Sequence, residues 1–218
     1  IPWYDALTIL AMVAVVTKKV ELGTAVLVLP LRHPVIFAKQ AATIDALSGG
    51  RLTLGVGAGW LSDEFEALGV PFKTRGQRLE EWIMLARNCW TGAPQPFQGT
   101  HYSLPSNLMS YPRPKHTIPF LIGGHSPTAL KRAGTLGDGW LPQQSARSIN
   151  PAALKDPIAL MKNSAAAAGV HHIHHTPWIQ GTPICWDVPG TTGARLPLHP
   201  LLRFRVPRLV PVNLKLGR

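Results

Sequence analysis

The sequence predicts an α/β fold built on a parallel sheet, and three observations lead to this prediction. Helical and strand-like patterns alternate along most of the chain, the strand at 20–29 is apolar on both faces, and each strand ends in glycine or proline. Such alternation is typical of βα units with buried parallel strands. The pattern fits a closed barrel and an open doubly wound sheet equally well.

The first third of the chain is predicted to contain helix 5–17, strand 20–29, helix 34–47 and strand 51–57. Apolar residues at helical spacing define each helix. Pro34 suits the first turn of the second helix, His33 is expected to cap it, and Gly49 suits the left-handed residue after its end.

The middle of the chain is predicted to contain a short helix from residue 62, helix 74–90, strand 119–122, helix 127–134 and strand 140–141. Residues 91–118, rich in proline, glycine and polar groups, predict a long loop or hairpin. An excursion of this length exceeds an ordinary connection and often has a function. We expect it to help cover a ligand site.

The composition favours one globular domain within the 218 residues, because 45% are apolar and only 15% are charged. The apolar run from Ala25 to Leu31 is too short to cross a bilayer, and no signal sequence precedes it. We therefore expect a cytoplasmic chain whose natural N-terminus is missing before Ile1. In that compartment Cys89 and Cys185 are expected to be free thiols.

The net charge of +11 raises the alternative of a nucleic-acid partner. From Gly169 onward the only acid is Asp187, so the excess charge is concentrated in the last segment. It does not form a stripe along a helix, and this distribution argues against nucleic-acid binding.

The run Gly123-Gly124-His125-Ser126-Pro127-Thr128 links a strand to a helix. Backbone N–H groups and the positive end of a helix dipole meet at such a turn, which suits a phosphate. Ser126, Thr128 and His125 add side-chain donors. On spacing alone, a phosphate site and an ordinary capped turn are equally supported.

The run Gly55-Val56-Gly57-Ala58-Gly59-Trp60 ends another strand. Trp60 stands where a dinucleotide-binding fingerprint would need its last glycine. Two glycines on one side of a strand leave a flat space for a planar ring, although close packing explains them as well.

Other polar clusters are weaker candidates for a functional site. Arg32 and His33 follow a strand and could face a ligand. The run His171-His172-Ile173-His174-His175 has no nearby acid or cysteine to complete a metal site, so we expect no metal. Hydrolase and P-loop motifs are absent from the sequence.

Three blocks of sequence together resemble one known family. They are GTAVLVLPLRHPVIFAKQAATIDALSGGRLTLGVGAGWLSDEFEALGVPF, a helix ending in CWTG, and PFLIGGHSPTALKRAGTLGDGW. Their order and spacing over residues 1–141 resemble the luciferase-like monooxygenase family, and more narrowly its actinobacterial coenzyme F420-dependent oxidoreductases. The resemblance implies a luciferase-like (β/α)₈ TIM barrel with its active site at the carboxyl ends of the strands.

The resemblance also implies where a cofactor would bind. F420, or FMN as the alternative, would place its phosphate region at Gly123, Gly124, His125, Ser126 and Thr128. Its ring system would lie against Gly57, Gly59 and Trp60. Some F420 enzymes carry a carboxylate where Trp60 stands, so the resemblance assigns no catalytic acid or base here.

The chain departs from the family at both ends. The resemblance implies that the first strands of the barrel precede Ile1, so residues 1–168 are expected to form an incomplete barrel domain. Residues 169–218 are basic and rich in proline, histidine and arginine, which suggests an irregular tail or a shifted reading frame.

The expected function is transfer of hydride between the reduced cofactor and a small organic substrate, or a monooxygenase reaction. We expect a second copy of the chain as a candidate partner, in a homodimer. We expect no membrane partner. The alternatives are an inactive remnant of such an enzyme and, with less support, a nucleic-acid-binding protein.

Overall fold

The computed structural model describes residues 4–142 and 151–170 of the chain. Its main sheet has four strands in the order β1-β2-β5-β6, and every neighbouring pair is parallel. The strands are β1 (Leu22–Val28), β2 (Leu52–Gly57), β5 (Phe120–Gly123) and β6 (Gly139–Leu141). The predicted parallel α/β sheet is therefore confirmed.

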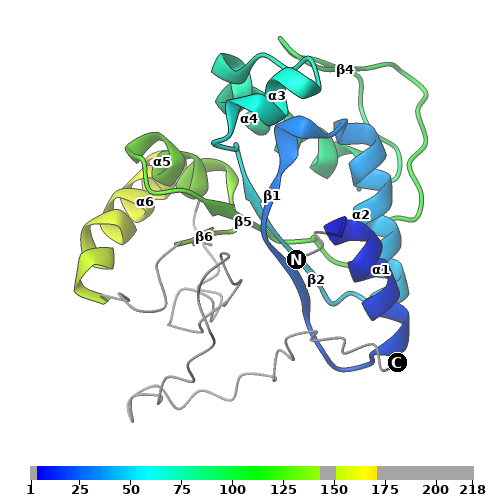
Figure 1. Ribbon diagram of the computed structural model, residues 1–218. Coiled ribbons are helices and arrows are strands. Elements are labelled where there is room, and N and C mark those ends of the chain that lie inside the picture. The colour runs from blue at the N-terminus through cyan, green and yellow to red at the C-terminus, as the bar shows by residue number, and fades with distance from the viewer. Residues whose placement is uncertain (1–3, 143–150, 171–218) are drawn as a thin grey trace.

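Helices accompany the strands in the predicted alternation. They are α1 (Ala6–Val16), α2 (Pro34–Ser48), α3 (Ser62–Ala67), α4 (Arg75–Cys89), α5 (Pro127–Leu136) and α6 (Lys155–Ala167). Short 3₁₀ turns cover Leu29–Leu31, Phe72–Thr74 and Pro151–Leu154. Figure 1 shows α1 and α2 side by side along β1 and β2, and α5 and α6 paired near β6.

The hydrophobic core lies between the sheet and the helices α1, α2 and α4. Phe37 and Trp82 pack edge to face at 4.5 Å, and Trp90 stacks on Phe120 at 5.2 Å. Because side chains alternate along a strand, Phe120 enters this core while its neighbour Leu121 points to the opposite face of the sheet. That second face carries the glycines of the candidate site.

The excursion at residues 91–118 contains the hairpin β3 (Phe97–Gln98) and β4 (Ser103–Leu104), which pair antiparallel. Its turn is held by Glu81 on α4, whose carboxylate accepts backbone N–H groups from Thr100 and His101 at 2.9 Å and Tyr102 at 3.1 Å. Burial alone would raise the pKa of Glu81, but these three donors outweigh it and lower the pKa below its usual value.

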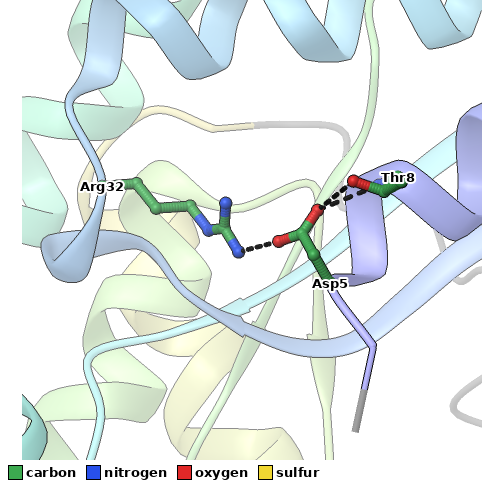
Figure 2. Close-up of polar contacts among 3 residues, drawn as sticks. All are labelled: Asp5, Thr8 and Arg32. Carbon is green, nitrogen blue, oxygen red and sulfur yellow. Dashed lines mark hydrogen bonds and ion pairs between the residues drawn. The ribbon is translucent and has the colours of Figure 1, made fainter.

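The start of α1 is fixed by Asp5, which was not singled out from the sequence. Its Oδ1 accepts the Thr8 backbone N–H at 2.9 Å, and its Oδ2 accepts Nη2 of Arg32 at 2.6 Å (Figure 2). Partial burial tends to raise the pKa of Asp5, while the Arg32 guanidinium and the Thr8 donors bring it down to about 2. The Arg32 side chain is therefore paired with the N-cap residue of α1.

The predicted capping role of His33 is wrong in one respect. His33 occupies the N-cap position of α2, but its side chain makes no capping hydrogen bond. Its ring instead lies edge-on to Tyr102 at 6.3 Å, so the imidazole is turned toward the hairpin. At the other end of α2, Gly49 adopts the predicted left-handed conformation with φ of 78°.

Helix α6 was not predicted as an element. It packs closely on α5, where a Cβ added to Gly134 would lie 2.3 Å from the backbone oxygen of Met161. The glycine thus allows the two helices to approach backbone to backbone.

Several predictions fall on residues outside those described, namely Cys185, the histidine run at 171–175 and nearly all of the basic segment from 169. Cys89 is a free thiol in the core, and burial raises its pKa. In the part of the chain that the structure describes, no helix is long and apolar enough to cross a membrane.

Candidate functional site

The two glycine-containing segments predicted from the sequence meet at one edge of the sheet. Because β2 and β5 are parallel and pair Val56 with Ile122, the next residues, Gly57 and Gly123, follow side by side at the carboxyl ends. The Val26 side chain lies beside both glycines. A Cβ added to Gly57 would lie 3.1 Å from Cγ2 of Val26, and one added to Gly123 would lie 3.0 Å from Cγ1. The missing side chains leave a flat surface beside Val26, which is itself 43% exposed.

The turn after β5 is a tight strand-to-helix connection. Gly124 has a φ of +117°, and a Cβ there would lie 2.9 Å from the Ala129 side chain, so a larger residue would be strained. Ser126 is the N-cap of α5, and its hydroxyl oxygen accepts the Ala129 backbone N–H at 3.2 Å. Pro127 occupies the first helical turn. The predicted cap and helix start are confirmed.

This turn presents unused hydrogen-bond donors. Within residues 4–142 and 151–170, no acceptor is bound to the backbone N–H groups of Gly124, Ser126 and Thr128. The side chains of Ser126 and Thr128 are exposed, as is that of His125. Free N–H groups at the positive end of a ten-residue helix favour an anion.

Trp140 on β6 supports the turn from the next strand, although no sequence pattern indicated that it belongs to the site. Its Nε1 donates a hydrogen bond to the backbone oxygen of Gly124 at 2.8 Å. The His125 ring stands edge-on to the Trp140 indole at 5.5 Å. The indole therefore fixes the conformation of the turn and limits the positions open to His125.

The turn after β2 carries the other predicted residues. Gly59 has a φ of +89°, and an added Cβ would lie 2.7 Å from Val28 and 2.8 Å from Phe65. Trp60 follows it and is 82% exposed. Arg75, at the start of α4, donates from Nε to the Gly59 oxygen at 3.2 Å, a contact that no sequence pattern indicated.

The arrangement suits an elongated ligand with an anionic arm and a flat ring system. The anion would lie at the α5 N-terminus, and the ring would lie toward Gly57, Gly123 and the exposed Trp60. Among the residues that the structure describes, no three histidine, cysteine, aspartate or glutamate side chains gather as a metal site requires.

Comparison with known proteins relates this architecture to enzymes of known cofactor. The F420-dependent glucose-6-phosphate dehydrogenase of Amycolatopsis mediterranei is 39% identical over 144 residues, which are 64% of this chain and 42% of that protein. The chain spans less than half the length of the curated relatives it matches.

Solved structures share the fold. An F420-dependent secondary alcohol dehydrogenase in complex with an F420–acetone adduct superposes with a TM-score of 0.67 at 27% identity, covering 76% of this chain and 50% of that one. A type II Baeyer–Villiger monooxygenase of Pseudomonas putida, in complex with FMN, superposes with a TM-score of 0.65 over 76% of this chain and 49% of its own. At 19% identity, that second likeness concerns the fold alone.

The family assignment follows from a match over most of the sequence. The family described as luciferase-like monooxygenase matches residues 1–189, which include every strand and helix of the described structure. The parallel α/β architecture and its structural neighbours agree with this match, and the predicted fold class is confirmed. The chain belongs to the luciferase-like monooxygenase family.

Proposed function

We propose that this chain binds coenzyme F420, with FMN as the alternative, and takes part in hydride transfer to or from a small organic substrate. The observation that carries the proposal is the turn from Gly123 to Thr128, where the backbone N–H groups of Gly124, Ser126 and Thr128 have no acceptor among the residues that the structure describes. Both cofactors have a phosphate group on the arm of a planar ring system, and this turn matches that chemistry.

The residues of the two turns would bind different parts of the cofactor. The N–H groups of Gly124, Ser126 and Thr128 would hold the phosphate, and the hydroxyls of Ser126 and Thr128 would add donors. The flat surface at Gly57 and Gly123 would receive the ring, and Trp60 would shield it from water. The bound cofactor supplies the redox chemistry, whereas the protein fixes and covers the ring.

The relatives favour F420 over FMN. The 39% identical dehydrogenase and the 27% identical alcohol dehydrogenase are both named for F420, whereas the FMN-containing structure shares only the fold at 19% identity. The substrate class is a small organic molecule with a carbon centre that can exchange hydride.

Fluorescence titration of the purified full chain tests the proposal. F420 and FMN would each be titrated, with riboflavin as the matched ligand that has the FMN ring but lacks its phosphate. We expect F420 to bind most tightly, and FMN to bind at least tenfold more tightly than riboflavin, since a few charge-assisted hydrogen bonds are worth more than 1.4 kcal/mol together. If neither F420 nor FMN binds, the proposal fails and the inactive-remnant alternative is favoured.

A further inference from the structure

The side chain of Arg75 links the start of α4 to the turn that carries Trp60. Its Nε donates to the Gly59 oxygen at 3.2 Å, and its Nη1 donates to the Phe72 oxygen at 3.0 Å. The guanidinium carbon also lies 3.9 Å above the centre of the Phe72 ring. One cation thus contacts the β2–α3 turn and the segment before α4 at the same time.

The other side of the Gly59 turn is packed as tightly. Val28 and Phe65 leave no room for a side chain at Gly59, and Phe65 is fully buried. Phe65 in turn meets Phe72 edge to face at 5.2 Å, so the ring under the guanidinium is itself fixed. Arg75 therefore joins Gly59 to a rigid aromatic pair.

Trp60 has no comparable support of its own. It is 82% exposed, and within residues 4–142 and 151–170 its indole has no aromatic or cationic partner. Its position is consequently set by the backbone of the turn. Among the described side chains, Arg75 is the one that hydrogen-bonds to that backbone at Gly59.

Helix capping does not explain an arginine at this place. Arg75 is the first residue of α4, where a positive charge meets the positive end of the helix dipole. A cation there opposes the dipole, so the contacts with Gly59 and Phe72 must offset an unfavourable term. The position favours a role in holding the turn rather than in starting the helix.

We propose that Arg75 is a positioning residue that places Trp60 against the cofactor ring by holding the Gly59 backbone. This inference rests on the proposed function, because it assumes that a ring binds beside Trp60. Arg75 itself need not touch the cofactor, and its effect passes through the turn.

A double-mutant cycle on the full chain tests the inference. Arg75→Met keeps an unbranched side chain over Phe72 but removes every N–H donor, and Trp60→Ala removes the indole whose position is at issue. Arg78→Met is the matched control, since Arg78 lies three residues further along α4, donates to the Thr74 hydroxyl and does not contact Gly59. Thermal melting of each variant is recorded beside the dissociation constants for F420 and FMN.

We expect Arg75→Met to weaken binding of F420 about tenfold, the typical effect of one charge-assisted hydrogen bond, while Arg78→Met has little effect. In the Trp60→Ala background, Arg75→Met should weaken binding no further, because its effect acts through Trp60. A merely structural arginine would lower the melting temperature and add its effect in both backgrounds.

The outcomes separate the inference from the proposed function. Wild-type protein that binds neither F420 nor FMN overturns both. Tight wild-type binding that Arg75→Met leaves unchanged, or additive effects of the two substitutions, overturns the inference alone. Should Arg75→Met fail to fold, Arg75→Lys takes its place, because lysine keeps the charge over Phe72 but lacks the Nε–H directed at Gly59.

Discussion

Glu81 gives the sharpest prediction for the stability of the fold. The residue is 9% exposed, and its carboxylate accepts three backbone N–H groups from the β3–β4 turn, at 2.9, 2.9 and 3.1 Å. Glu81→Gln keeps the size of the side chain but replaces one acceptor oxygen with an NH₂ group. That group faces N–H donors, so at least one backbone N–H loses its acceptor.

The expected loss can be estimated from these contacts. Hydrogen bonds to a charged group contribute about 1.5–3 kcal/mol each, so three at the low end amount to about 4.5 kcal/mol. The glutamine retains part of this energy and no longer has a buried charge to desolvate. We therefore expect Glu81→Gln to lower the free energy of unfolding by about 2–3 kcal/mol at neutral pH.

Urea unfolding followed by circular dichroism measures this loss, and Glu66→Gln, at an exposed carboxylate on α3, serves as the control. Amide hydrogen exchange at Thr100, His101 and Tyr102 should become faster in the Glu81 variant only. A loss below about 0.5 kcal/mol, within the range of ordinary surface substitutions, would refute the reasoning.

The same contacts predict a dependence on pH. The pKa of Glu81 is lowered in the folded state, so its contribution is complete above the ordinary glutamate pKa of about 4.3 and is lost as the pH falls through the lower folded value. The stability difference between wild type and Glu81→Gln should accordingly shrink below that pH. A difference that stays constant down to the acid transition would contradict this assignment.

Two further predictions concern the ends of helices. Asp5→Asn should lower the free energy of unfolding by less than about 1 kcal/mol at neutral pH, since the Asp5 side chain is 41% exposed. This difference should disappear as the pH falls from about 3.9 toward the folded pKa of about 2. Urea unfolding at several pH values checks both points. Arg51→Met should lower the free energy of unfolding by about 3 kcal/mol in the same assay, because Arg51 donates to oxygens at the carboxyl ends of both α1 and α2. A loss near zero would contradict this prediction and would mean that water replaces these contacts.

Local sequence patterns were sufficient for most of the elements. The apolar strands, Pro34, Gly49 and Ser126 each act within a few residues of the chain, and the structure places all of them as expected. His33 differs because its ring turns to Tyr102, a residue 69 positions away that no local pattern connects to it. Helix α6 was missed because its packing on α5 depends on Gly134, which reads as an ordinary helical glycine.

At the candidate site, too, local sequence patterns reveal only the residues that act within their own turn. The glycines of both turns could be found from the sequence, because glycine at a strand end is a local signal. Trp140 and Arg75 could not, since their importance lies in hydrogen bonds to Gly124 and Gly59, each 16 residues away. Residues that support a site from a neighbouring element need the folded structure to be identified.

The central claim, that the α5 N-terminus binds the cofactor phosphate, is tested most directly at Ser126. Aspartate and asparagine both cap helices well, so Ser126→Asp and Ser126→Asn should each preserve α5 and its hydrogen bond with Ala129. Aspartate alone places a negative charge where the phosphate would lie. We predict that Ser126→Asp melts no lower than Ser126→Asn but binds F420 at least tenfold more weakly. Equal F420 affinities of the two variants would contradict a phosphate site at this turn.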